Sequence, residues 1–296
     1  MALSIRWRYK LDRFLHRIAS AFHSEPKPTR RPRLCPACST LVGSTATKCH
    51  ECGASLTFSL AAASRSLTKL LPSTSPATYC IVVLNGLLFT VSLLATVRSR
   101  GQLNLFGGIS PQVLERMGAS LPLPYNVNQP WRLVMAIFLH GGLLHIAMNS
   151  WVLMDIGHMV EEVYGSARYL FIYVLTGMAG FVLSSFWLHF SVGASGALMG
   201  LIGVMLAITT RRGGAYMQMV RSQLIRWVMY ILFFGLLIPG IDNLAHLGGL
   251  GAGFLIGRVM EDRQPATMEE RRRAYTLGWL TGLVILGCFF LMVQYR

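Results

Sequence analysis

Apolar stretches of about 20 residues recur from Thr78 to the end of the chain, and this is the length that a helix needs to cross a lipid bilayer. Hydrophobic residues make up 53% of the chain and charged residues only 13%, which is less charge than a soluble domain of this size carries. We therefore predict an all-α polytopic membrane protein. Seven stretches are expected to span the membrane: 78–97, 133–160, 169–188, 194–210, 227–238, 243–259 and 274–293.

The positive charge is distributed unevenly, and its distribution predicts an orientation. The formal net charge is +15, and basic residues are concentrated before the first apolar stretch and in alternate loops, for example at Arg211, Arg212 and Arg271. This pattern places the N-terminus in the cytoplasm, and seven spans then place the C-terminus outside. The expected location is the bacterial cell membrane. The basic segment before the first span favours contact with anionic membrane lipid over nucleic acid, because no nucleic-acid recognition motif accompanies it.

Two Cys-x-x-Cys pairs precede the first span, Cys35 with Cys38 and Cys49 with Cys52, and ten residues separate the pairs. Each pair places two thiolates on one tight turn, and two such turns complete the tetrahedral site that zinc prefers. The alternative is a pair of disulfides or free thiols, although disulfides are rare in the reducing cytoplasm. We predict a structural Zn²⁺ in a small cytoplasmic zinc ribbon. The expected role of this ribbon is to bind a cytoplasmic protein partner or to regulate the membrane part of the chain.

Polar residues also occur inside the apolar stretches, where they are costly. His145 and Asn149 lie four residues apart and hence on one helix face, and His246 lies near the start of the 243–259 stretch. Ser195 lies at the start of the 194–210 stretch, two residues after Gly193. Each of these residues alone could serve only in packing or in an interhelical hydrogen bond. The alternating topology, however, places all of them near the outer ends of their helices.

Small residues predict how the two helices that carry Ser195 and His246 pack. Ala245, Gly249, Gly253 and Gly257 form a stripe at four-residue spacing, and Gly196 and Gly200 form a shorter stripe after Ser195. Close packing of these stripes would bring His246 within reach of Ser195. Asp242 is the only acidic residue near His246, so a serine–histidine dyad would depend on packing to hold the imidazole tautomer.

These motifs together resemble the rhomboid family of intramembrane serine proteases. The matching segments are Trp131-Arg132, His140 to Asn149, Gly193-Ala194-Ser195-Gly196 and Ala245 to Gly253, in the order of the family. The resemblance extends over about residues 105–257 and implies a six-helix core with one additional C-terminal span. The zinc module lies outside it.

The resemblance implies a role for each matching residue. Ser195 would be the nucleophile and His246 the general base, and His145 and Asn149 would form the oxyanion hole with the backbone N–H of Ser195. Gly193 would leave room for the substrate carbonyl. Trp131, Arg132 and His140 would support the first loop, the long external segment at 98–132 between the first two expected spans. No cofactor is expected for catalysis, and the partners would be transmembrane protein substrates.

One position departs from the family pattern. Met199, four residues after the serine, replaces a tyrosine that often stacks on the base in this family, so we expect the dyad to be held less firmly than in relatives with the tyrosine. Two other functions compete with proteolysis. A non-catalytic relative that binds or escorts membrane proteins would lack the serine or the histidine, and a transporter with histidine proton relays would need polar residues through the whole membrane depth.

The chain therefore divides into five expected regions. These are a basic amphipathic segment and linker (1–32), the zinc-ribbon-like module (33–56), a linker (57–76), the rhomboid protease core of six spans (77–260), and a cytoplasmic loop with the seventh span (261–296).

Overall fold

The computed structural model describes residues 32–35, 38–56, 74–100, 108–187 and 190–295. The chain forms two compact units, with the boundary between Ala63 and Ser64. The predicted amphipathic helix, apart from residue 32, and most of the predicted linker at 57–76 lie outside the described residues.

The first unit contains two equivalent turns, each built around one cysteine pair. Strands β1 (Arg33–Leu34) and β2 (Leu41–Val42) pair in antiparallel fashion beside the first turn. In that turn the N–H of Cys35 donates to the carbonyl of Thr40, 2.7 Å away, and in the second turn the N–H of Cys49 donates to the carbonyl of Ala54, 2.9 Å away. The same spacing of five residues recurs in both, so each pair of thiols is presented by the same backbone geometry.

The described part of the second unit consists mainly of helices. Its long helices are α3 (Pro76–Arg100), α7 (Leu143–Tyr164), α8 (Ser166–Ser185), α9 (Ser195–Arg211), α10 (Ala215–Leu237), α11 (Asn243–Val259) and α12 (Met268–Gln294). Between α3 and α7 lie the short helices α4 (Pro111–Arg116), α5 (Leu123–Asn128), α6 (Trp131–Met135) and η1 (Ala136–Phe138). Within the described part of the chain, four helices are long and apolar enough to cross a membrane, or five if the bent pair of α6–η1 with α7 is one span. The chain is thus a helical membrane bundle.

Two predicted spans differ from the helices. The apolar stretch 133–160 is not one helix, because α6–η1 and α7 meet at a bend of 91°. Gly141 and Gly142 stand at this break, and Gly142 is extended, so the helix cannot continue through them. The stretch at 227–238 belongs to a helix that begins at Ala215. Its first part carries two arginines and does not stand out as an apolar stretch, although Val220 and Leu224 in it are buried one turn apart. The helix as a whole is nevertheless apolar enough to cross a membrane.

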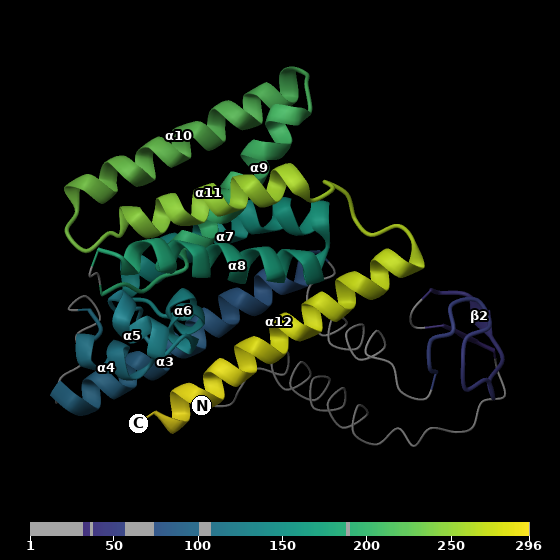
Figure 1. Ribbon diagram of the computed structural model, residues 1–296, viewed down its shortest axis with the longest axis horizontal. Helices are drawn as coiled ribbons and strands as arrows, with labels where there is room; N and C mark the ends of the chain where they lie inside the picture. The colour runs from purple at the N-terminus through teal and green to yellow at the C-terminus, as the bar shows by residue number, and fades with distance from the viewer. Residues whose placement is uncertain (1–31, 36–37, 57–73, 101–107, 188–189, 296) are drawn as a thin grey trace, which may run out of the picture. The chain divides into compact units, whose positions relative to one another are not determined.

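Helix α9 lies at the centre of this unit. Every residue from 196 to 205 is buried, as expected of a helix that is apolar on all sides. The neighbouring helices α7, α8, α10 and α11 all contact it. Figure 1 shows α10 along one edge of the bundle, beside α11. In α10 only Val220 and Leu224 are buried, so its second half is lightly packed.

A buried carboxylate joins the ends of three helices. Glu161, near the end of α7, is 3% exposed. Its two oxygens accept the backbone N–H groups of Ala77 and Thr78 at 2.9 and 2.8 Å, and the hydroxyls of Thr78 and Ser166 at 2.7 and 2.6 Å. Because Ala77 and Thr78 begin α3 and Ser166 begins α8, the negative charge also faces two positive helix termini.

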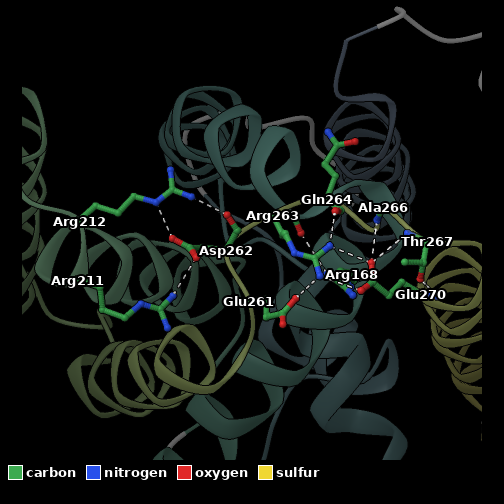
Figure 2. Close-up of polar contacts among 10 residues, drawn as sticks. All are labelled: Arg168, Arg211, Arg212, Glu261, Asp262, Arg263, Gln264, Ala266, Thr267 and Glu270. Atoms are coloured by element: carbon green, nitrogen blue, oxygen red, sulfur yellow. Dashed lines mark hydrogen bonds and ion pairs between the residues drawn. The ribbon is translucent and has the colours of Figure 1, made fainter.

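The connection from α11 to α12 is fixed by ion pairs. Figure 2 shows Asp262 between Arg211 and Arg212 at the end of α9, with N–O separations of 3.6 and 2.6 Å. Arg263 donates to both oxygens of Glu270, at 2.9 and 2.8 Å, and Glu270 belongs to a capping box at the start of α12. These contacts hold α12 to the ends of its neighbours.

Candidate active site

Ser195 is the first residue of α9, and the backbone before it is fixed on both sides. The N–H of Gly193 donates to the carbonyl of Ala136 in η1, 2.9 Å away, and Ser191 forms a bridge with Ser120 through two backbone hydrogen bonds of 2.9 and 3.1 Å. Gly193 has a φ of +136°, which side chains other than hydrogen rarely permit. The serine is half-buried at the N-terminus of a helix, where backbone N–H groups lack intrahelical partners.

His246 lies in the first turn of α11 and is 3% exposed. Its Nε2 atom is 2.8 Å from Oγ of Ser195. The backbones of the two helices are in direct contact below this pair, since a Cβ added to Gly249 or Gly253 would lie 1.9 Å from the carbonyl oxygens of Gly196 and Gly200 respectively. The two small-residue stripes therefore face each other as the spacing predicts.

His145 presents its Nε2 atom to the same place. Its Nδ1 atom accepts the N–H of Gly141 at 3.4 Å, so the ring proton is on Nε2 and can be donated. A Cβ on Gly193 would lie 2.7 Å from this Nε2 atom, which shows how closely the ring approaches the backbone before Ser195.

Asn149 lies one turn further along α7 and is 6% exposed. Its Nδ2 atom donates to the carbonyl of His145, 2.8 Å away, and its second N–H stays available for another acceptor. The structure therefore brings Ser195, His246 and Gly193 together with His145, which Asn149 follows on the same helix. This arrangement supplies a hydroxyl, a base acceptor and several hydrogen-bond donors.

The first loop is held by the residues that the motif predicts for that role. The guanidinium of Arg132 donates to the carbonyls of Glu115 and Ala119 at 2.6 and 3.2 Å and to the side chain of Gln129 at 2.6 Å. The ring of Trp131 lies 5.8 Å from that of Tyr295, near the end of α12.

Two further predicted residues are fully buried. His140 packs edge-on against His145, with ring centroids 5.1 Å apart. Met199 is 0% exposed and lies within the core cluster one turn after Ser195.

Sequence reasoning did not assign a role to Asn243. Its Oδ1 atom is 3.3 Å from Nδ1 of His246, on the side of the ring opposite Ser195. The spacing of three residues on one helix face is a signal that could have found it. Asp242 instead caps α11, since one carboxylate oxygen accepts the N–H of Ala245 at 3.0 Å and the other accepts the hydroxyl of Ser184.

The four cysteines of the first unit form a candidate metal centre. None of the four forms a disulfide, and their sulfur atoms lie within 4.8 Å of one another. The Sγ atoms of Cys35 and Cys52, and those of Cys38 and Cys49, are 3.6 Å apart. Four thiolates at a Zn–S distance of about 2.3 Å stand about 3.8 Å apart in a tetrahedron, so this set fits a tetrahedral ion such as zinc.

The pKa values of two of these thiols are shifted in opposite directions. The hydrogen bond with the Thr40 side chain lowers the pKa of Cys38 to about 6, whereas burial raises the pKa of Cys52 to about 12. A bound cation would favour the thiolate form of all four.

Comparison with known proteins identifies the helical unit. Residues 127–263 match the Rhomboid domain model, and this segment includes every residue of the candidate active site. The chain is 34% identical over 183 residues to RHOMBOID-like protein 6, mitochondrial, of Arabidopsis thaliana, covering 59% of this chain and 58% of that protein. It is 32% identical over 155 residues to Rhomboid protease GluP of Bacillus subtilis, covering 52% of this chain and 31% of that protein.

A third relative is matched over most of its length. The chain is 33% identical over 195 residues to Rhomboid-like protease 2 of Toxoplasma gondii, covering 63% of this chain and 68% of that protein. The chain spans about half the length of several other curated relatives that it matches. The motifs, the helical bundle and these similarities lead to one conclusion: the chain belongs to the rhomboid family.

Proposed function

We propose that this chain is an intramembrane serine protease that hydrolyses peptide bonds in or next to transmembrane segments of membrane proteins. The observation that carries the proposal is the 2.8 Å separation between Oγ of Ser195 and Nε2 of His246. A serine hydroxyl becomes a nucleophile when a base within hydrogen-bond reach can take its proton. Similarity to the named protease GluP supports the same reading.

The proposed reaction has two stages. Nε2 of His246 takes the hydroxyl proton as Oγ of Ser195 attacks the carbonyl carbon of the scissile peptide bond, and the carbonyl oxygen becomes an oxyanion. The imidazolium then gives its proton to the leaving amine as the C–N bond breaks. Water repeats these steps on the acyl-enzyme and releases the second product.

The oxyanion would be stabilised by three donors. These are the backbone N–H of Ser195, the Nε2–H group of His145 and the second N–H of Asn149. Gly193 leaves space for the carbonyl, because any side chain there would meet the ring of His145. Donors fixed in place before the reaction are each worth about 10²- to 10³-fold in rate.

Substrates would be transmembrane proteins whose helices unwind locally, since helical hydrogen bonding shields the backbone carbonyls from attack. We place the site near the extracytoplasmic face and the cysteine unit in the cytoplasm, on the distribution of basic residues. The cysteine unit would hold a structural Zn²⁺ and serve for binding a cytoplasmic partner. A bacterial cell membrane stays a prediction, because the relatives include plant proteins, one of which carries the word mitochondrial in its name.

The proposal is tested by labelling the purified full chain in liposomes with a fluorophosphonate, which reacts with activated serines. We expect label on the wild type and none on Ser195→Ala or His246→Ala. Matched controls are Ser222→Ala on an exposed face of α10 and His158→Ala on α7, and both should label like the wild type. Label that persists in Ser195→Ala would overturn the assignment. A folded wild type that takes no label would favour the non-catalytic escort function.

Asn149→Ala provides a graded test of the oxyanion hole. We expect the labelling rate to fall by about 10²-fold without reaching zero, because the other two donors remain. A wild-type rate would exclude Asn149 from the hole.

A further inference from the structure

Asn243, the first residue of α11, contacts the side of His246 that faces away from the serine. Its Oδ1 atom lies 3.3 Å from Nδ1 of His246, and its Nδ2 atom donates to the backbone carbonyl of Leu232 in α10, 3.0 Å away. The side chain therefore joins the proposed general base to a neighbouring helix. The inference below rests on the proposed function, since it concerns the orientation of that base.

The contact with Leu232 fixes which end of the amide faces the histidine. A backbone carbonyl can only accept a hydrogen bond, so the NH₂ group of Asn243 must point to α10 and its oxygen to His246. An amide oxygen can also only accept, so the hydrogen bond requires a proton on Nδ1 of His246. The lone pair is then on Nε2, which faces Oγ of Ser195 as a base requires.

Helix α10 is shaped to receive this amide. A Cβ on Gly235 would lie 2.0 Å from Oδ1 of Asn243, so only glycine leaves room for the side chain at this position. The buried residues of α10, Val220 and Leu224, are both in its first half. The amide of Asn243 is therefore a principal polar contact between the second half of α10 and the helix that carries His246.

Among the residues that the structure describes, no carboxylate is hydrogen-bonded to Nδ1 of His246. Asp242 acts electrostatically on His246 from the preceding turn, as does His145 from α7. Both oxygens of Asp242, however, accept hydrogen bonds from Ala245 and Ser184. Asn243 thus occupies the place that an orienting aspartate has in a catalytic triad.

We propose that Asn243 is the positioning residue of the general base: its amide, held by the Leu232 carbonyl of α10, keeps His246 in the tautomer whose Nε2 atom faces Ser195. A shift of the second half of α10 would release the amide and, with it, the imidazole. The orientation of His246 toward Ser195 therefore depends on the position of α10.

The test measures the rate of fluorophosphonate labelling against pH for the full chain in liposomes. For Asn243→Ala we expect a 10- to 100-fold lower rate, about the cost of a catalytic group displaced by 1 Å. For the isosteric Asn243→Asp, a carboxylate beside Nδ1 should favour the imidazolium. The acid limb of the profile should then move up by about one pH unit or more. A residue with a purely structural role would leave the position of this limb unchanged.

The contribution of α10 is tested by Gly235→Ala, whose added methyl group would displace the Asn243 amide. We expect this variant to be labelled more slowly than the wild type, although neither His246 nor Asn243 is substituted. The matched control is Gly251→Ala in α11, where an added Cβ meets nothing within 4 Å and the rate should not change. Thermal unfolding of each variant separates a local effect from a loss of fold.

Two results would overturn the inference while leaving the proposed function intact. One is a wild-type acid limb in Asn243→Asp together with a wild-type rate in Asn243→Ala. The other is a wild-type rate in Gly235→Ala, which would remove the dependence on α10. If Asn243→Ala does not fold, the isosteric Asn243→Asp profile decides alone. Results that contradict the proposed function itself are different from these: the wild type would take no label, or Ser195→Ala would still be labelled.

Discussion

His145 and His246 face one serine with opposite hydrogen-bonding roles. The N–H of Gly141 leaves the proton of His145 on Nε2, where it can be donated, and the oxygen of Asn243 leaves the proton of His246 on Nδ1, so that Nε2 can accept. In each case one local partner on the far side of the ring decides the chemistry of the near side. A change in the far-side partner of either histidine would therefore alter the hydrogen-bonding role of that histidine without any change at the serine.

Gly193 gives a prediction at this scale. Gly193→Ala places a methyl group 2.7 Å from Nε2 of His145 on a backbone with φ of +136°, so either the ring or the loop must move. We expect the labelling rate of Ser195 to fall by about 10²-fold or more, through loss of one oxyanion donor. Labelling kinetics with the fluorophosphonate measure this.

The control for Gly193→Ala is Gly43→Ala in the cysteine unit, where the added Cβ has no neighbour within 4 Å. Wild-type labelling by Gly193→Ala would mean that the carbonyl of the substrate does not need this space.

The sequence alone could predict the residues of the proposed site, but not how each ring is oriented. Ser195, His145 and His246 stand in recognisable motifs, and the glycine stripes predict that their helices approach. No sequence motif assigns Asn243 a role toward His246. Its contact with Leu232 joins two helices, and such a contact depends on how the helices pack. Whether these residues perform catalysis stays a prediction until the labelling is done.

At the scale of the elements, the contact between α9 and α11 determines the distance between nucleophile and base. No side chain separates the two backbones at Gly249 and Gly253, so main-chain atoms set the separation of the two helices there. Such contacts leave little freedom for adjustment, because packed backbones cannot change rotamer as side chains do.

Gly253→Ala tests this contact. The added Cβ would lie 1.9 Å from the carbonyl oxygen of Gly200, and the helices must separate to admit it. We expect a lower unfolding midpoint, corresponding to about 1–3 kcal/mol of overpacking, together with a lower labelling rate. Gly251→Ala, two residues away on the same helix, should change neither quantity. Equal stability of both variants would contradict the close contact.

The Glu161 carboxylate gives a second prediction for the elements. Glu161→Gln replaces an acceptor-only group, which receives four hydrogen bonds, by an amide whose NH₂ would face other donors. We expect a loss of about 1.5–3 kcal/mol in the free energy of unfolding, the range for hydrogen bonds to charged groups.

The neighbouring Glu162→Gln is the control, since that side chain is exposed and should tolerate the change. Chemical denaturation of both variants in the same detergent measures the difference. Similar free energies would show that Glu161 does not join α3 to α7 and α8.

The elements also show where sequence patterns fail. Hydropathy predicted the limits of α11 correctly at Asn243 and Val259, because the helix and its apolar stretch coincide. It joined α6 and α7 into one span, because the short helices of the first loop are as apolar as a true span and only Gly141 and Gly142 mark the bend. It placed the start of α10 at Trp227 or a little before, whereas the helix begins at Ala215, because two arginines interrupt its first half.

At the scale of the whole molecule, the chain combines two units with different sources of stability. The helical unit has an extensive buried core, whereas the buried core formed by the described residues of the cysteine unit consists of Cys35, Val42 and Cys49. So small a core cannot offset the conformational entropy of folding, and a metal would have to supply the remainder.

We therefore predict one zinc ion per chain, held by the four thiolates. Removing it with a chelator should unfold residues 33–56 and leave the labelling of Ser195 unchanged, because the two units have separate cores. Metal analysis of the purified protein and limited proteolysis measure the first effect. Cys35→Ser should abolish binding, and Cys80→Ser, in α3, should retain it. A metal-free wild type, or loss of labelling on chelation, would contradict this prediction.

The lengths of α9 and α11 have a consequence for depth. Each helix has 17 residues and ends with an arginine in its last turn, Arg211 or Arg258, which can remain at the aqueous boundary. At 1.5 Å per residue each helix measures about 25 Å, whereas the hydrocarbon layer is about 30 Å thick. The first residues of the two helices, Ser195 and Asn243, would then stand about 5 Å below the opposite boundary, and deeper if the helices tilt. Under the proposed function, bilayer thickness would then select which bond of a substrate comes level with the serine.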